Sequence, residues 1–159
     1  MNLNTKILSY IKITRPLNVL ITFLVVVVAI LISQSEQLEL YTILLASIAA
    51  SLVAAAGNIV NDIYDIESDK ISHPNRVLVL GTLNKTEVKL EYIILNFISA
   101  IISINLSQTL FAIVFISALL LFIYSAYLKK IPLIGNIVIA MLTGLAFIYG
   151  GFASGNPVA

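Results

Sequence analysis

The chain has 159 residues, of which 60% are hydrophobic and 11% charged, and its formal net charge is +1. A mean hydropathy of +1.05 is far above that of water-soluble domains, so we expect an integral membrane protein, with no nucleic acid as a partner. The sequence has no cysteine and one histidine, His73, which excludes disulfides, thiolate chemistry and a zinc site of several imidazoles and leaves metal binding to acidic side chains.

The first two elements in chain order are a surface helix and a membrane span. Residues 1–16 interleave apolar side chains with Lys6, Lys12 and Arg15, which is typical of an interfacial helix, here ending at Pro16. Residues 17–33 are almost wholly apolar and long enough to cross a bilayer with their interfacial neighbours. The next loop, 34–39, contains acids but no Lys or Arg, so the amino terminus is expected in the cytoplasm.

The rest of the chain predicts four more spans joined by short turns. They run from about residue 41 into an acidic stretch at 57–70, over 84–106, over about 109–128 and over about 133–153. Asn84 and Glu87 resemble a capping box that opens the third span. All nine Lys and Arg then fall on the cytoplasmic side, which supports five spans. We therefore expect an all-α transmembrane helical bundle in the plasma membrane, with residues 1–159 forming a single domain.

The acidic stretch 57–70 is the most informative part of the sequence. Asn58, Asp62, Asp65 and Asp69 fall at i, i+4, i+7 and i+11, so on a helix they share one face within an arc of about 60°. The helix dipole disfavours negative charge at this carboxyl end, and oxygen ligands suit hard cations such as Mg²⁺. A solvated helix end is the alternative, but the one-face spacing favours a metal site at the three aspartates.

Basic residues converge on the same membrane face as these acids. The set comprises Lys12, Arg15, Lys70, Arg76, Lys129 and Lys130. Acids alone indicate a cation site, whereas acids together with Lys and Arg favour an anionic ligand bridged by metal, with diphosphate and Mg²⁺ as the natural pair. Positive-inside topology by itself would also put each of these cations there.

Polar residues within the spans are further candidates. We expect Asn58 to contact ligand or metal, while Asn18 and Asn136 stay open between ligand contact and hydrogen bonding between helices. Tyr124 either belongs to the interfacial aromatic belt or faces a reacting cation. Polar residues of the third span, such as Ser99, are assigned to packing.

The acidic motif also supports a family resemblance. Asn58-x-x-x-Asp62-x-x-Asp65-x-x-x-Asp69, with Asn61 before Asp62 and Asn75-Arg76 following, resembles the first aspartate-rich motif of the UbiA superfamily of intramembrane prenyltransferases. Arg15-Pro16-x-Asn18, Tyr124-Ser125 with Leu128-Lys129-Lys130, and Gly135-Asn136 with Thr143-Gly144 extend the resemblance over nearly the whole chain. Within the superfamily, the features look most like the archaeal-type digeranylgeranylglyceryl phosphate synthases, which alkylate a glycerol-linked lipid phosphate.

The resemblance implies a helical bundle whose cytoplasmic cavity binds an isoprenyl diphosphate through Mg²⁺. A long isoprenyl group would pass to a lipid-phosphate hydroxyl, or in the runner-up interpretation to an aromatic acceptor of quinone or haem biosynthesis. Asp62, Asp65 and Asp69 match the metal-binding, catalytic acids. The candidate substrate-binding residues are Asn58, Arg15, Asn18, Lys70, Arg76, Tyr124, Lys129 and Asn136.

Two departures from the family pattern matter. The run Arg76-Val77-Leu78-Val79-Leu80-Gly81 lacks the usual Pro after the arginine and the Pro-Ser-Gly turn. The family also has about nine spans and a second aspartate motif, which the 159 residues lack. We expect the chain to be the amino-terminal part of such an enzyme, inactive alone and in need of the missing half. A cation-transport module and a non-catalytic subunit are the alternatives from other classes.

Overall fold

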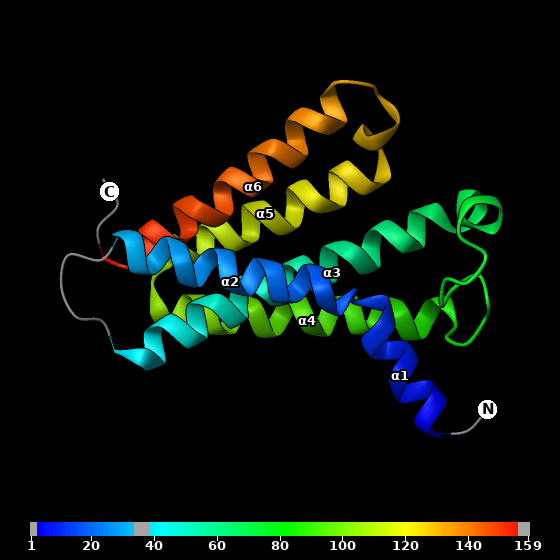
Figure 1. Cartoon of the computed structure of the whole chain (residues 1–159), viewed down its shortest axis with the longest axis horizontal. Coiled ribbons are helices and arrows are strands. Elements are labelled where there is room, and N and C mark those ends of the chain that lie inside the picture. Colours follow the sequence, from blue (N-terminus) through cyan, green and yellow to red (C-terminus); the bar gives the residue numbers. More distant parts are fainter. Residues whose placement is uncertain (1–2, 34–38, 156–159) are drawn as a thin grey trace.

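The computed structural model describes residues 3–33 and 39–155, and this part of the chain consists of helices and connecting turns, without a strand (Figure 1). The prediction of an all-α bundle is confirmed. The predicted acidic loop at 34–39 lies outside the described residues, except for Glu39.

The two N-terminal helices meet at a sharp turn. Helix α1 (Leu3–Ile13) is the predicted surface helix, and its exposed Ile7 and Leu8 suit contact with a membrane surface. Helix α2 (Pro16–Ser33) begins at Pro16, whose fixed φ and missing N–H are compatible with the first position of a helix. Between them Arg15 has a φ of 54°, an unusual left-handed backbone that turns the chain so that α1 projects from the bundle (Figure 1).

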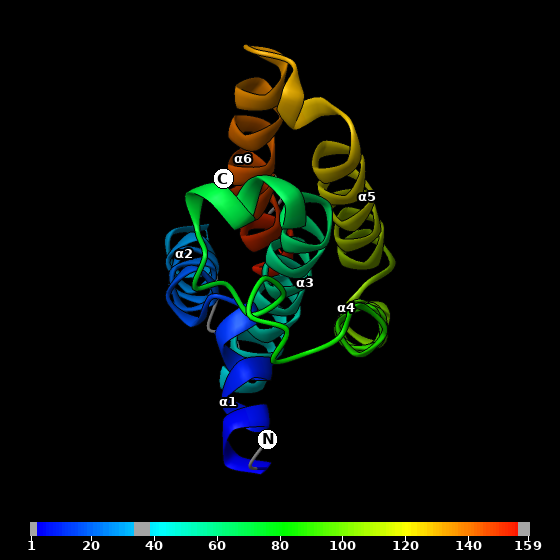
Figure 2. The same cartoon turned by 90° about the vertical axis from the view of Figure 1, so that its right-hand side faces the viewer.

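Helix α3 (Leu40–Ser72) is the centre of the fold. Its 33 residues span about 50 Å, whereas a bilayer core needs about 30 Å, so its acidic end has length to spare. Helix α3 packs against α2 and against the three long helices that follow it, as the end-on view in Figure 2 shows.

The chain continues through three more long helices. They are α4 (Lys85–Leu106), α5 (Gln108–Ala126) and, after the short 3₁₀ helix η1 (Leu128–Lys130), α6 (Ile134–Ala153). The predicted capping box of α4 is confirmed: Asn84 Oδ1 accepts from the Glu87 amide at 2.9 Å, and Glu87 Oε2 accepts from the Asn84 amide at 2.8 Å.

The number of candidate spans differs from the predicted five. Among the described residues, four helices are long and apolar enough to cross a membrane, namely α2, α3, α5 and α6. The predicted span 84–106 corresponds to α4, which is 22 residues long but carries Lys85, Glu87, Lys89 and Glu91 in its first two turns. Composition therefore supports one span fewer than the count of basic residues suggested.

Two apolar clusters hold the bundle together at its two ends. One cluster, which includes Val26, Val53, Val114 and Tyr149, joins α2, α3, α5 and α6 at the end far from the acids. The other, which includes Ile59 and Val88, joins α3 to α4 near the acidic end, and the loop between those helices packs on it. The acidic end of α3 thus sits on a fixed support.

Close helix contacts and one buried hydrogen bond set the spacing of the bundle. At Gly150 on α6, an added Cβ would lie 2.5 Å from the Cβ of Ala29 and 3.2 Å from backbone atoms of α2, so only glycine permits this approach. Ser99 Oγ donates to the Ala49 carbonyl at 2.7 Å and ties α4 to α3, in agreement with the packing role predicted for it.

Candidate functional site

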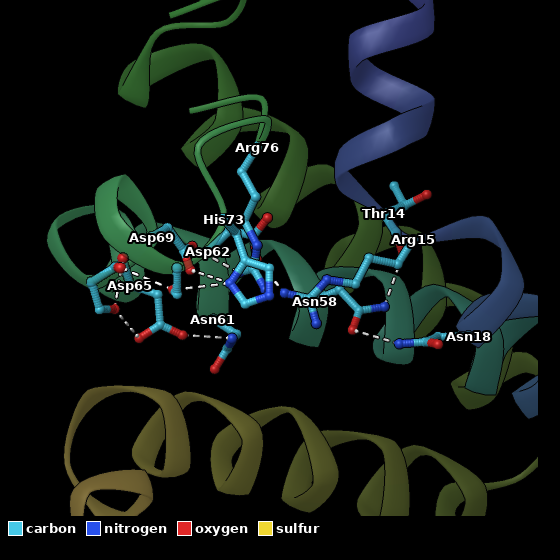
Figure 3. Close-up of polar contacts among 12 residues, drawn as sticks. Thr14, Arg15, Asn18, Asn58, Asn61, Asp62, Asp65, Asp69, His73 and Arg76 are labelled. Carbon is cyan, nitrogen blue, oxygen red and sulfur yellow. Dashed lines mark hydrogen bonds and ion pairs between the residues drawn. The ribbon is translucent and has the colours of Figure 1, made fainter. Parts of the chain in front are cut away.

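The acidic end of α3 forms the centre of the candidate site. Asp62 and Asp69 are buried, and Asp65 is partly exposed. All three lie near the carboxyl end of α3, beside the loop that carries His73 and Arg76 (Figure 3). Buried carboxylates are stable only when they are paired, so their partners define the chemistry of the site.

Asp62 and Asp69 share one arginine. Nη1 of Arg76 lies 2.8 Å from Asp62 Oδ1 and 2.7 Å from Asp69 Oδ2 (Figure 3). Arg15 reaches the same side, with its Nη2 atom 2.5 Å from Asp62 Oδ1. His73 adds a contact, its Nδ1 lying 3.5 Å from Asp69 Oδ1. We call these five residues the arginine side of the site.

Asp65 has a different set of partners. Nζ of Lys129, in η1, lies 2.6 Å from Asp65 Oδ1, and Asn61 Nδ2 donates to Asp65 Oδ2 at 2.8 Å. Lys129 also reaches Asn61 Oδ1 at 3.4 Å, which closes a triangle between α3 and η1. We call Asn61, Asp65 and Lys129 the lysine side of the site; Figure 3 shows Asn61 and Asp65 on the face of α3 that looks toward α5.

The predicted single stripe of carboxylates is thus divided between two sets of partners. Asp65 is displaced by about 60° around the helix from Asp62, and that offset carries it toward η1. In the described part of the chain, no three Asp, Glu, His or Cys side chains converge closely enough to hold a metal by themselves. The three aspartates are instead matched by three cations, Arg15, Arg76 and Lys129, so these six side chains carry no net charge together.

Local backbone geometry places Lys129 at the site. Helix α5 ends at Ala126, and η1 turns the chain before α6 begins. A Cβ at Gly135 would lie 3.4 Å from the Leu128 carbonyl oxygen and from Lys129 Cα, so the glycine gives η1 room to fold back on α6. The Lys129 side chain is only 11% exposed as a result.

The asparagines bind one another and the backbone. Asn58 Nδ2 donates to the Thr14 carbonyl at 2.8 Å, and Asn18 Nδ2 donates to Asn58 Oδ1 at 3.5 Å (Figure 3). Asn58 therefore joins α3 to the turn that precedes α2, and it lies in the wall of the cavity. The expected contact of Asn58 with metal or ligand stays a prediction.

A cavity of about 470 Å³ opens next to these asparagines, within the usual size range of ligand pockets. Its polar end is lined by Arg15, Asn18, Asn58, Asn61 and Tyr124. Mainly apolar side chains of α2, α3, α5 and α6 line the rest, together with the hydroxyl groups of Thr22, Ser117, Ser125, Thr143 and Tyr149. The chemistry of the cavity suits an amphiphile with a charged head at the acidic end of α3 and an apolar tail inside the bundle.

Two of the predicted substrate-binding residues lie apart from the acids. Lys70 Nζ pairs with Glu67 at 2.8 Å on the exposed side of α3. Asn136, in the first turn of α6, is exposed and is not among the residues that line the cavity. Ligand contact by either residue stays a prediction.

Two residues of the site were not chosen from the sequence. Asn61 links Asp65 to Lys129 and lines the cavity, and its position four residues before Asp65 was the available signal. His73 reaches Asp69 with the same four-residue spacing. Asn61 lies off the stripe that Asp62 and Asp69 share, whereas His73 continues that stripe at the end of α3.

Comparison with known proteins places this geometry in a family. Residues 19–159 match the UbiA prenyltransferase family. Curated relatives include digeranylgeranylglyceryl phosphate synthases of Saccharolobus solfataricus, 36% identical over 145 residues, and of Methanococcus aeolicus, 37% identical over 156 residues. These alignments cover 91% and 97% of this chain but 51% and 55% of the relatives, so the chain spans about half the length of the curated relatives it matches.

Solved structures agree in fold. A structure of digeranylgeranylglyceryl phosphate synthase in membranes has a TM-score of 0.91 at 33% identity, covering 96% of this chain and 55% of its own. A UbiA homologue from Archaeoglobus fulgidus, bound to DMAPP and Mg²⁺, has a TM-score of 0.87 at 21% identity over 95% of this chain and 56% of its own. The second likeness supports the fold alone. Family match, relatives and fold agree, and the chain belongs to the UbiA prenyltransferase family.

Proposed function

We propose that the chain carries half of the active site of a Mg²⁺-dependent prenyltransferase. The enzyme would move a long, geranylgeranyl-type isoprenyl group from its diphosphate to the hydroxyl of a lipid phosphate in membrane ether-lipid biosynthesis. The observation that supports this most is the cavity, whose mainly apolar wall leads to a polar end lined by Arg15 and Asn61, the partners of Asp62 and Asp65. The curated relatives, named digeranylgeranylglyceryl phosphate synthases, favour this acceptor class.

The acids fit a magnesium ion in one specific way. Asp62 and Asp69 hold the Arg76 nitrogen between two carboxylate oxygens, at 2.8 and 2.7 Å, so a cation already lies between them. Mg²⁺ is commonly held by one or two carboxylates together with substrate phosphates and water. Asp62 and Asp69 would therefore be one pair of ligands, with Asp65 as a further ligand near Lys129. The bound metal would neutralise charge on the diphosphate.

The basic residues would change partners when substrate binds. Arg15, Arg76 and Lys129 neutralise the aspartates in this structure. With the carboxylates engaged by metal, the same guanidinium and ammonium groups would turn to diphosphate oxygens, for which a planar guanidinium is well suited. The polar site would thus exchange one balanced set of charges for another.

The chemistry assigned to these groups is substitution at an allylic carbon. The bond between that carbon and the bridging oxygen breaks, and its electron pair leaves with the diphosphate, which Arg15, Arg76 and Lys129 stabilise. The acceptor hydroxyl oxygen bonds to the carbon, and its proton passes to the departing diphosphate. Tyr124, at the polar end of the cavity, would face the positive charge on the allylic group, while Asn18 and Asn58 shape that end. Apolar walls would exclude competing water.

The orientation proposed for the site follows from charge. The basic residues of the site lie with the acidic end of α3, and an excess of Lys and Arg marks the cytoplasmic side of membrane proteins. We infer that the site faces the cytoplasm from the plasma membrane. Lys70 and Asn136 would at most contact substrate at the margin of the site, since neither is paired with its aspartates.

Ligand binding tests this proposal. The chain is placed in lipid nanodiscs, and retention of radiolabelled geranylgeranyl diphosphate is measured with and without Mg²⁺. We expect Mg²⁺-dependent binding that is lost in Asp62→Asn and kept in Glu67→Gln, a matched control because Glu67 is an exposed acid on the same helix. Equal binding by both variants would contradict the metal assignment.

Transfer assays address the acceptor. The chain, alone and combined with the second half of a relative, is offered geranylgeranylglyceryl phosphate or a hydroxybenzoate. We expect label on the lipid phosphate, and only in the presence of the second half. Label on the aromatic acid alone would reverse the acceptor assignment.

A further inference from the structure

The cavity has a defined deep end as well as a polar end. On α3 it is lined from Asn61 back to Ala50, and the rise of a helix makes that distance about 16 Å. On α6 it is lined from Ile139 to Tyr149, which is about 15 Å. Helix α6 runs away from η1 and from the acidic end of α3 (Figure 1). Tyr149, near the carboxyl end of α6, therefore lines the end of the cavity opposite Asn61.

Tyr149 is fixed in place. Its side chain is among the largest that are fully buried, and it belongs to the apolar cluster that joins α2, α3, α5 and α6. Its hydroxyl lies 3.4 Å from the buried Ser103 Oγ on α4, within reach of a hydrogen bond. The next residue, Gly150, is pressed against Ala29 of α2. A ligand reaching this ring therefore meets a wall that cannot move aside without separating α6 from α2.

We propose that Tyr149 forms the floor of the cavity and limits the length of the isoprenoid chain that the protein accepts. The proposal rests on the proposed function, since it takes the cavity to hold the tail of an isoprenyl diphosphate. Each added apolar group strengthens binding while free cavity remains. Once the tail meets the floor, a further unit must either overpack the core or stay outside, and the gain ends. The ring, rather than the aspartates, would then select the tail.

Two substitutions move the floor in opposite directions. Tyr149→Ala deepens the cavity, and we expect affinity for geranylfarnesyl diphosphate, one isoprene unit longer than geranylgeranyl diphosphate, to rise by at least about tenfold. Ala146→Leu adds bulk one turn before Tyr149, at a position that lines the cavity. We expect it to weaken geranylgeranyl diphosphate by about tenfold while geranyl diphosphate still binds.

Two further variants act as controls. Tyr149→Phe keeps the ring and removes the contact with Ser103, so it should keep the wild-type preference for length. Phe147→Ala removes an aromatic ring from the exposed side of the same helix, outside the cavity, and should also leave the preference unchanged. A change in length preference that is absent from both controls is thereby attributed to the shape of the floor and not to a general disturbance of α6.

The experiment measures binding of geranyl, farnesyl, geranylgeranyl and geranylfarnesyl diphosphate to the chain in nanodiscs with Mg²⁺. Opposite shifts in Tyr149→Ala and Ala146→Leu support the floor, and the Ala146→Leu shift alone does so if Tyr149→Ala does not fold. Binding that depends on Asp62 but shows the same length profile in every variant overturns the floor and leaves the proposed function intact. Absence of diphosphate binding at every length in the wild type overturns the proposed function, and the floor with it.

Discussion

The arginine side and the lysine side of the site hold the same kind of group in different ways. On the arginine side, two buried carboxylates share Arg76, and Arg15 adds a second guanidinium. On the lysine side, one carboxylate that is 24% exposed is held by an ammonium group and an amide. The first side is anchored by the turn before α2 and the loop after α3, and the second by η1.

The difference indicates a division of labour along one helix. A shared guanidinium between two buried carboxylates is costly to break, because each partner left behind is a buried charge. A single ammonium contact to a carboxylate that water can reach is exchanged at lower cost, and Asp65 is the most exposed of the three carboxylates. We therefore expect the arginine side to dominate both stability and metal binding, and the lysine side to respond to the diphosphate with less effect on the fold.

The largest effect is expected from Asp62→Asn. The change leaves Arg15 without its carboxylate and Arg76 with only Asp69, and breaking a buried pair of this kind costs about 3 kcal/mol. Thermal unfolding in nanodiscs, followed by circular dichroism, measures the loss. Glu67→Gln provides the baseline, and a melting temperature equal to that baseline would remove the distinction between the two sides.

Lys129→Met comes next and should separate binding from stability. The variant loses one charge-assisted contact to Asp65, worth about 1 kcal/mol of stability because water can reach the carboxylate left behind, which is 24% exposed. Its effect on diphosphate should be larger, about tenfold to a hundredfold in affinity, because the ammonium group would contact the ligand directly. The neighbouring Lys130→Met is the matched control, since of these two lysines only Lys129 is paired with an aspartate in the described residues. Equal loss of affinity in both variants would mean a general charge effect.

Asn61→Ala sharpens the comparison by testing whether the two sides act independently. Asn61 bonds to Asp65 and Lys129 and to no residue of the arginine side among the described contacts. We expect a loss of diphosphate affinity of about threefold to tenfold. In double-mutant cycles, Asn61→Ala should couple with Lys129→Met and be additive with Arg76→Met. Coupling of similar size in both cycles would merge the two sides into one network.

The sequence predicted the elements of this site better than their pairing. The capping box at Asn84 and Glu87 and the helical run through Asp69 rest on local spacing, which a sequence displays directly. Arg15 and Arg76 could be selected as basic residues on the same membrane face, but their convergence on Asp62 depends on a left-handed backbone at Arg15 and on the fold of the loop after α3.

The cavity and the number of spans were harder to predict from the spacing of residues in the sequence. The cavity is lined by four helices, some of them distant in the sequence, so Tyr149 could be recognised only after α6 was packed on α2. The count of five spans rested on the side of the membrane assigned to each cation, whereas the first turns of α4 carry charges that lower its apolar character. For the cavity the deciding information is tertiary packing, and for the number of spans it is the length and composition of each helix.

The smallest effect concerns α1. Arg15, which follows this helix, is paired with Asp62 in the site, and a second ion pair joins Lys6 of α1 to Glu87 of α4. Lys6 donates to Glu87, and this hydrogen bond, followed by that from the Asn84 amide, keeps the pKa of Glu87 below its usual 4.5. The hydrogen bond to Glu87 also raises the pKa of Lys6 above 10.5. A lowered carboxyl pKa contributes stability above pH 4.5 that is lost as the pH falls through the folded pKa.

Glu87→Gln isolates this second contact, since glutamine can still complete the capping box without a charge. We expect amides of α1 to exchange hydrogen slightly faster in the variant at pH 7, and the difference from wild type to vanish only as the pH falls through the lowered pKa of folded Glu87, below which the native carboxyl is also neutral. Comparing both proteins at each pH cancels the intrinsic pH dependence of exchange. A difference that persists in acid would mean that the side chain of Glu87 stabilises α1 through packing and not through its charge. The ion pair of Arg15 would then be the charged contact that fixes α1.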